Sequence, residues 1–221
     1  MKTTARILTL TLCVLMSSIT SAGDWISLFD GKSLEGWKPY KLDAIGSSWV
    51  VDDGTLHLSE KGGGDIITAQ QFGDFELQFE WKISEGGNSG VMYCVRPGDK
   101  APYMSGPEYQ ILDDSRHRDG KNESTSSAAL YAMIPPEGKN LNKVGEWNTA
   151  RIRLQDQNLQ HWLNGSKVVE TTLGDENWDQ MVANSKFRQW PQFGKSPAGH
   201  ICLQDHGDKV WFRNIRIREL E

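Results

Sequence analysis

The stretch GPEYQILDD at residues 106–114 combines the alternation of a β-strand with unusual polar side chains. Residues two apart in a strand share a face, so Glu108 and Gln110 point one way while Tyr109 and Ile111 point the other. A carboxyl group among aromatic and aliphatic neighbours can have a raised pKa and act as a general acid or base. Glu108 is therefore the first catalytic candidate, and the alternative is an exposed carboxylate in a surface ion pair.

The segment VMYCVR at residues 91–96 has the same two-faced character. Regular alternation places Met92, Cys94 and Arg96 on a mixed face opposite an apolar one. The guanidinium of Arg96 could clamp a hydroxyl, carboxylate or keto oxygen of a ligand. The alternative for Arg96 is an ion pair at the end of the strand.

The segment HICLQDH at residues 200–206 carries Gln204 and His206 on one face together with Cys202. An imidazole titrates near neutrality, so His206 could move protons or bind a metal, or it could simply cap a loop. Gln204 is a candidate substrate contact. If these segments are neighbours, their mixed faces would form the floor of a cleft; otherwise they are ordinary exposed strand residues.

Three further residues are candidate substrate contacts. Asn88 and Ser89 lie in GGNSG, which is chiefly a turn signal but could supply hydrogen bonds to a ligand. Asp113 follows the strand that carries Glu108 and is expected to begin a loop. The sequence has no nucleophile elbow, phosphate loop, or close His or Cys pair. Carboxylate, amide, imidazole and guanidinium groups from separate strands suit a carbohydrate ligand, and most of the nine tryptophans are expected in the core.

The strands that would position these groups are indicated by alternating apolar residues at 48–59, 74–84, 149–155, 159–172 and 209–220. The dipeptides Asp53-Gly54 and Asn164-Gly165 predict hairpin turns within two of these stretches. Only residues 177–187 have helical spacing of apolar side chains. Many short strands and one short peripheral helix predict an all-β fold, a sandwich or jelly roll of antiparallel sheets.

The beginning of the chain has the pattern of a secretory signal peptide. Lys2 and Arg6 precede an apolar run at 7–16 that ends in SSITSA, which predicts cleavage after Ala22. The run is too short for a permanent transmembrane anchor. We therefore expect an exported protein, periplasmic or extracellular, without a membrane anchor.

The remaining residues, 23–221, are expected to form a single domain. Removal of two basic residues lowers Lys+Arg from 24 to 22 against 29 Asp+Glu, so the formal charge changes from −5 to −7. Such a chain is not expected to bind nucleic acid. In an oxidising compartment Cys94 and Cys202 could form a disulfide, but nothing in the sequence requires it.

Several motifs together resemble a known bacterial family. They are LFDGKSLEGW, GGNSGVMYCVRP, GPEYQILDD, EWNTARI, LNG, SKFRQWPQFG and GHICLQDHGDKVWFRNIRIREL, in this order along nearly the whole chain after residue 22. The chain thereby resembles the 3-keto-disaccharide hydrolase family, also described as 3-keto-glucoside 1,2-lyase and 3-keto-2-hydroxy-glucal hydratase. The resemblance implies a concanavalin A-like, glucanase-like jelly roll.

The resemblance also implies a sugar substrate whose C3 hydroxyl a partner sugar 3-dehydrogenase has oxidised to a ketone. The ketone acidifies the C2 proton, so that a base can remove it, the C1 group can leave, and water can add to the enone. By residue type, Glu108 or His206 suits the base or acid, and Arg96, Gln110 and Lys186 suit stabilisation of the enolate oxygen. A divalent metal held by Glu108 and His206 could polarise the ketone instead.

Two other functions remain open from the sequence. In jelly-roll glucanases the strand motif is Glu-x-Asp followed by a second Glu, and the matching positions here are Glu108, Gln110 and Asp113. An amide replaces the helper acid and the last carboxylate is shortened, which weakens the case for direct hydrolysis by two carboxyl groups. The second alternative is a non-catalytic carbohydrate-binding module that uses the same face.

Overall fold

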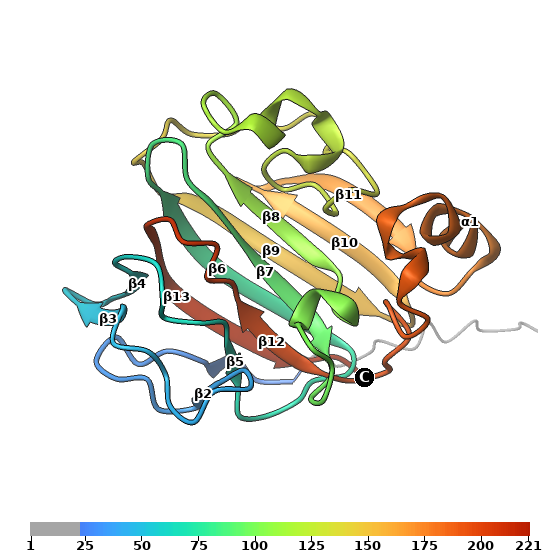
Figure 1. The fold of residues 1–221 in the computed structure, drawn as a ribbon. Helices are drawn as coiled ribbons and strands as arrows, with labels where there is room; N and C mark the ends of the chain where they lie inside the picture. The colour runs from blue at the N-terminus through green and yellow to red at the C-terminus, as the bar shows by residue number, and fades with distance from the viewer. Residues whose placement is uncertain (1–22) are drawn as a thin grey trace, which may run out of the picture.

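The computed structural model describes residues 23–221, and the predicted signal peptide at 1–22 lies outside this part of the chain. Two antiparallel sheets lie one above the other, with a single α-helix to one side (Figure 1). The predicted all-β jelly-roll class is confirmed. None of the helices in the described residues is long and apolar enough to span a membrane.

The larger sheet contains the strands that alternation predicts most clearly. Its order is β11 (Ser166–Thr172), β10 (Asn158–Leu163), β9 (Asn148–Gln155), β6 (Phe75–Ile83), β13 (Val210–Glu219), β4 (Thr55–Leu58) and β3 (Trp49–Asp52), and β1 (Ile26–Ser27) pairs with β13 as the eighth strand. Both predicted hairpin turns are present, with φ of 46° at Asp53 and at Asn164 followed by a glycine of positive φ. These are the conformations that two-residue hairpin loops require.

The smaller sheet has five strands, in the order β2 (Trp37–Pro39), β5 (Ile66–Thr68), β12 (His200–Leu203), β7 (Asn88–Val95) and β8 (Glu108–Leu112). The three segments with mixed polar faces are therefore neighbours, β12 next to β7 and β7 next to β8. This adjacency is what a shared cleft floor requires.

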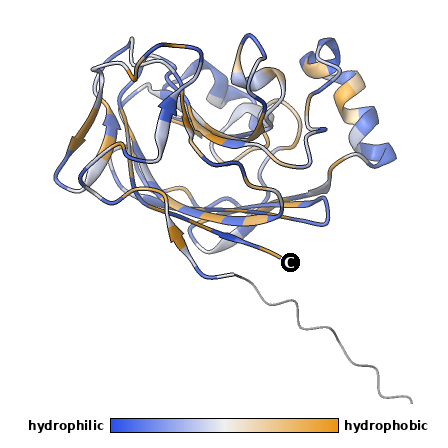
Figure 2. Ribbon diagram, turned by 90° about the horizontal axis from the view of Figure 1, so that it is seen from below, coloured by the Kyte–Doolittle hydropathy of each residue, from blue (hydrophilic) through white to orange (hydrophobic). Residues whose placement is uncertain are grey.

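The main core fills the space between the two sheets. Along β6 the alternating residues Phe75, Leu77, Phe79, Trp81 and Ile83 are all buried in it. Hydrophobic and hydrophilic residues alternate along the strands (Figure 2), because one face of each sheet packs inward. The outer face of each sheet points away from this core and does not take part in its packing.

Helix α1 (Glu176–Asn184) lies at the side of the sandwich, within one residue of its predicted start. The side chain of Asp175 caps it by accepting a hydrogen bond from the backbone N–H of Trp178 at 2.7 Å. Four short 3-10 helices complete the described elements: η1 (Pro102–Met104), η2 (Arg118–Lys121), η3 (Glu123–Thr125) and η4 (Lys186–Gln189). The segments that contain η2, η3 and η4 bring further polar residues to the five-stranded sheet.

Candidate functional site

Glu108 lies on the face of the five-stranded sheet that points away from the main core. Its strand neighbours Tyr109 and Ile111 belong to the core between the sheets, as the alternation predicts. Glu108 pairs in register with Met92, and Gln110 pairs with Gly90. A Cβ atom at position 90 would overlap Oε1 of Glu108, so the carboxyl group lies across Gly90. The glycine provides the space in which the acid sits.

A β-bulge at Cys94 changes the face that the end of β7 presents. Cys94 has a φ of 55°, and the pairing of β12 with β7 shifts register beside it. Cys94 consequently enters the main core, while Val95 turns outward with Met92 and Cys202. The predicted face of Met92, Cys94 and Arg96 is wrong for this reason. Cys94 and Cys202 are both free and buried, in different apolar clusters.

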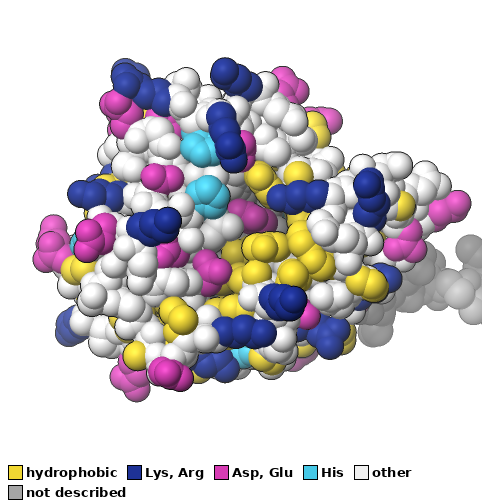
Figure 3. Space-filling model, viewed as in Figure 1, with side chains coloured by type: hydrophobic (Ala, Val, Ile, Leu, Met, Phe, Trp, Pro, Cys, Tyr) yellow, Lys and Arg dark blue, Asp and Glu magenta, His cyan; other side chains and the backbone are white. Residues whose placement is uncertain are grey.

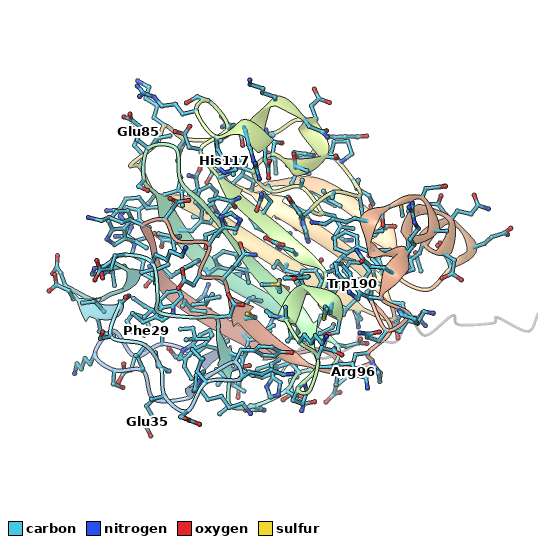
Figure 4. The ribbon with its side chains drawn as sticks, viewed as in Figure 1. Phe29, Glu35, Glu85, Arg96, His117 and Trp190 are labelled. Carbon is cyan, nitrogen blue, oxygen red and sulfur yellow. The ribbon has the colours of Figure 1, made fainter. Side chains whose placement is uncertain are left out.

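The bulge also removes Arg96 from the site. Arg96 follows the last residue of β7 and its side chain is exposed. It lies four residues beyond Met92, the partner of Glu108, which corresponds to about 13 Å of strand. In Figure 4 Arg96 and His117 lie far apart across this face. The expectation that Arg96 contacts the reacting part of a substrate is therefore not supported.

The environment of Glu108 is that of a carboxylic acid at a reaction centre. Its side chain is buried, with 6% of the residue exposed. Burial raises its pKa to about 8, the Lys186 ammonium opposes this rise, and the Asp65 carboxylate adds to it. A hydrogen bond with the Gln204 side chain also favours the charged form. Near neutral pH this group can both accept and return a proton.

Lys186 is the cation that faces Glu108. Its Nζ lies 4.2 Å from the centre of the Tyr131 ring, a cation–π contact that holds the ammonium over this face. Burial lowers the pKa of Lys186, while the carboxylates of Glu108 and Asp119 raise it. Tyr131 is itself fixed, because its backbone N–H donates to the Glu108 carbonyl at 3.1 Å and its hydroxyl donates to Asp119 Oδ2 at 3.3 Å.

Asn88, Gln204 and His206 complete the polar edge of the site. Asn88 Nδ2 lies 3.5 Å from His206 Nε2, and the His206 ring meets the edge of His117 with centroids 6.3 Å apart. Asn88 Oδ1 and Gln204 Oε1 are buried acceptors without a partner among the described residues. Unpaired buried acceptors are costly, and sugar hydroxyls would satisfy them. Figure 3 shows acidic, imidazole and apolar side chains side by side on this face.

Two predicted contact residues are occupied by the protein itself. The Gln110 amide donates from Nε2 to the Thr125 carbonyl at 3.3 Å, and its Oε1 accepts from the backbone N–H of Ile111 at 3.2 Å. Ser89 is fully buried, and its hydroxyl donates to the Gln204 carbonyl at 2.9 Å. Gln110 thus anchors the loop beside β8, and Ser89 joins β7 to β12. Neither is placed to bind substrate as predicted.

Asp113 likewise belongs to a turn rather than to the cleft. Its Oδ2 accepts from the Gly86 N–H at 2.7 Å, and its Oδ1 accepts from the Ser115 hydroxyl at 2.6 Å. Burial raises the pKa of Asp113, but these hydrogen bonds outweigh it and hold the pKa below its usual range. The expectation that Asp113 contacts substrate is not supported, and the expectation that it begins a loop is confirmed.

Asp65 is a site residue that sequence reasoning missed. It immediately precedes β5, and its Oδ1 accepts from the Asp205 backbone N–H at 2.9 Å. Burial raises its pKa to about 6, against the lowering effect of that hydrogen bond. Asp65, Tyr131 and Asp119 all come from loops, where no periodicity indicates which way a side chain points. Only the fold brings them to Glu108.

The described residues contain no group of three or more His, Cys, Asp or Glu side chains that could hold a metal ion. Glu108 and His206, the pair that the sequence suggests, would offer two ligands, and the Lys186 ammonium near Glu108 opposes a second cation. These residues do not fit a divalent ion held by the protein. The Lys186 ammonium can provide positive charge for a developing oxyanion instead.

Comparisons with known proteins agree with this fold. Residues 24–218 match the model of a family described as 3-keto-alpha-glucoside-1,2-lyase-like domain. A relative from Bacteroides thetaiotaomicron, named 3-keto-disaccharide hydrolase, is 39% identical, with 90% of this chain and 80% of the relative covered.

Solved structures of other proteins share this fold. A candidate glycosyl hydrolase from Parabacteroides distasonis superimposes with a TM-score of 0.83 at 36% identity, covering 90% of this chain and 94% of that one. A second from the same organism has a TM-score of 0.72 at 31% identity, covering 89% and 99%. A carbohydrate-binding module from Bacillus subtilis, at 13% identity and a TM-score of 0.52 with 81% and 93% covered, shares the fold alone.

Proposed function

Because this chain belongs to the 3-keto-alpha-glucoside-1,2-lyase-like family of carbohydrate-active enzymes, we propose that it cleaves 3-keto-glycosides, including 3-keto-disaccharides, by elimination. The observation that carries the mechanism is Glu108, a single buried carboxyl group whose pKa is about 8, beside the Lys186 ammonium. One base and one cation are what removal of a proton next to a ketone requires.

In the first step the Glu108 carboxylate removes the proton from C2 of a sugar that carries a ketone at C3. The electrons of the C2–H bond pass into the enolate, whose oxygen Lys186 stabilises. Burial favours the neutral carboxylic acid, so Glu108 keeps the proton that it has gained. An ordinary exposed glutamate would be a much weaker base, because its pKa is several units lower.

In the second step the enolate collapses and the C1–O bond breaks. The leaving oxygen takes a proton from an acid and departs as an alcohol, and an enone remains between C1 and C3. The acid we assign to this step is His206 or Asp65, and burial raises the pKa of Asp65 to about 6. Addition of water across the C1–C2 double bond then gives the free 3-keto sugar, so elimination followed by hydration amounts to hydrolysis.

The proposal also includes a partner enzyme and a location for the protein. The substrate ketone requires prior oxidation at C3, so a sugar 3-dehydrogenase is the functional partner that we infer. The basic and apolar start of the sequence supports export to the periplasm or beyond. Residues 23–221 would then be the mature single-domain enzyme.

Conventional double displacement is the less favoured mechanism. It needs two carboxyl groups about 5–5.5 Å apart across the glycosidic bond. The position that matches the second carboxylate is Asp113, whose Oδ1 accepts from Ser115 in the turn after β8 and whose Oδ2 accepts from Gly86 in the loop between β6 and β7. The helper position is Gln110, whose amide is also engaged.

The direct test uses purified residues 23–221 and a 3-keto glucoside with a chromogenic leaving group, beside the same glucoside without the ketone. We expect release from the keto compound alone, with exchange or loss of deuterium placed at C2. The same rates with and without chelator are expected, because the residues at the site do not fit a divalent ion.

Each other outcome has a defined meaning. Release from the parent glucoside with deuterium retained at C2 would replace elimination by conventional hydrolysis. Saturable binding of the keto compound without any release would indicate a binding module. Loss of release with chelator, restored by a divalent ion, would show that a metal polarises the ketone in place of Lys186.

A further inference from the structure

A groove of about 760 Å³ lies on the outer face of the eight-stranded sheet, on the other side of the sandwich from Glu108. It crosses strands β6, β9, β10 and β13 and reaches the segment around β1. The indole rings of Trp25 and Trp162 line it, and Gln78 and Thr149 lie between them. None of these residues takes part in the reaction proposed above.

The two indole rings are held in place by guanidinium groups. The Arg151 guanidinium lies 3.6 Å from the centre of the Trp162 ring. Arg216 and Arg218 lie 4.5 and 4.8 Å from the centre of the Trp25 ring. Both tryptophans are only half-buried although they are large and apolar. A rigid, partly exposed aromatic ring loses little conformational entropy when a ligand stacks on it.

The floor of the groove is polar, and its charges are largely paired. The Gln78 amide donates to Glu76 at 2.9 Å and accepts from Arg216 at 2.7 Å. Arg151 pairs with Glu76 at 3.6 Å, and Glu80, which also lines the groove, pairs with Arg213 at 2.6 Å. Guanidinium groups held by these partners offer hydrogen bonds to a ligand without a strong net charge. Such a floor favours a neutral, hydroxyl-rich molecule over a polyanion.

We propose that this groove is a second carbohydrate site, which binds a neutral oligosaccharide separately from the Glu108 cleft. The C–H faces of the sugar rings stack on Trp25 and Trp162, and the hydroxyl groups bind Thr149 and the flanking guanidinium groups. A volume of about 760 Å³ is within the range of ligand sites in proteins. The site would hold an enzyme near a glycan while the other sheet carries out the reaction.

The same face supplies a matched control in Trp147 and Trp211. Both are half-buried and stack under cations, with Lys82 Nζ 5.1 Å from the Trp147 ring and 4.6 Å from the Trp211 ring. Neither residue lines the groove. If exposed indoles on this sheet bound sugars indiscriminately, all four tryptophans would contribute equally.

Isothermal titration calorimetry of residues 23–221 with maltohexaose and with cellohexaose tests the proposal. We expect saturable binding of at least one of them, weakened about tenfold or more in Trp162→Ala and in Trp25→Ala and unchanged in Trp147→Ala. Thr149→Arg, an exposed substitution that fills the groove, should abolish binding while preserving the melting temperature. Failure of both hexasaccharides to bind would overturn the proposal, as would equal losses in Trp147→Ala and Trp162→Ala.

Binding of the hexasaccharide is measured independently of cleavage of the 3-keto glucoside. Glu108→Gln should bind the hexasaccharide as the wild-type protein does, and Trp162→Ala should release the chromogenic group from a small 3-keto glucoside at the wild-type rate. If Glu108→Gln also loses the hexasaccharide, the binding occurs in the cleft and the groove proposal is wrong, whatever the outcome for catalysis.

Discussion

Two buried glutamates, one on the outer face of each sheet, have opposite electrostatic properties. Glu76 on the eight-stranded sheet is 3% exposed and Glu108 on the five-stranded sheet is 6% exposed. Burial would raise the pKa of Glu76, but hydrogen bonds from Arg218 and Gln78 lower it below the usual value. Among residues 23–221 Lys186 is the cation that acts on Glu108, and burial raises the pKa of Glu108 to about 8.

The two differ in their neighbours and in how completely their charge is removed from solvent, which is more complete at Glu108. Glu76 accepts from Arg218 at 2.8 Å and pairs with Arg151 at 3.6 Å, so its charge is fully compensated. Fixed ion pairs of this kind stabilise a face but have no proton to exchange near neutrality. The incomplete compensation of Glu108 destabilises its charged form, and this makes it a base of useful strength.

The largest expected effect is a loss of turnover when Glu108, but not Glu76, is substituted. Glu108→Gln keeps the shape of the side chain but cannot accept the C2 proton, so turnover of a 3-keto glucoside should fall about 10²–10⁴-fold with little change in substrate binding. Steady-state kinetics together with direct binding measurements would check this result.

Glu76→Gln is the matched control. It should leave turnover per folded molecule unchanged and lower the free energy of unfolding by about 1–3 kcal/mol, because Arg151 and Arg218 lose their charged acceptor. Wild-type turnover in Glu108→Gln would remove Glu108 from the mechanism. Loss of turnover in a folded Glu76→Gln protein would show that the two faces are not functionally distinct.

The two lysines that stack on aromatic rings provide a second comparison. Lys186 lies over Tyr131 beside Glu108, and Lys82 lies over Trp211 on the other sheet. Lys186→Met should lower kcat/KM about 10²-fold, because the enolate oxygen loses its cation. It should also shift the acidic limb of the pH–rate profile to higher pH, since the Lys186 ammonium lowers the pKa of the Glu108 base.

Lys82→Met removes a similar cation–π contact without touching the site, so neither kcat/KM nor the pH–rate profile should change. Lys186→Arg, which restores the charge, should recover part of the lost rate. A loss in Lys186→Met without any shift of the pH profile would indicate that Lys186 acts through packing and not through its charge.

Strand alternation was sufficient to predict most of this fold and part of its site. The strands of the eight-stranded sheet follow from period-two burial, as in β6 between Phe75 and Ile83. Glu108 could be singled out because it shares a strand with Tyr109 and Ile111. The bulge at Cys94 could not be predicted, since its positive φ comes from pairing with β12 and not from the local sequence.

The site residues that lie in loops could not be predicted from the sequence either. Asp65 and Tyr131 reach Glu108 through long-range contacts that no periodic pattern reports. Gln110 faces the direction that the strand pattern predicts, yet its hydrogen bond to Thr125 is decided by tertiary structure, as is the hydrogen bond of Ser89 to Gln204. A sequence indicates which face of a strand a side chain is on, but not whether its polar atoms already form hydrogen bonds within the protein.

The smallest expected effect concerns the pH dependence of stability. The pKa of about 8 means that folded Glu108 keeps its proton up to about that pH, whereas the unfolded chain loses it near the usual glutamate pKa of 4.5. Between these values stability falls as pH rises, because the unfolded chain releases a proton that the folded protein retains. Glu108→Gln removes this loss, so the variant should match the wild-type melting temperature near pH 4 and exceed it by about 5–10 °C at pH 8.

Glu76→Gln should show the opposite sign. The lowered pKa of Glu76 contributes stability above its unfolded value, and this contribution disappears as pH falls through the folded value. The variant should therefore be less stable than the wild type at pH 8 and approach it in acid. Thermal melts of the three proteins from pH 4 to pH 8 would test both predictions. Parallel curves of melting temperature against pH for wild type and Glu108→Gln would mean that Glu108 is charged throughout this range. That result would contradict its role as a base with a raised pKa.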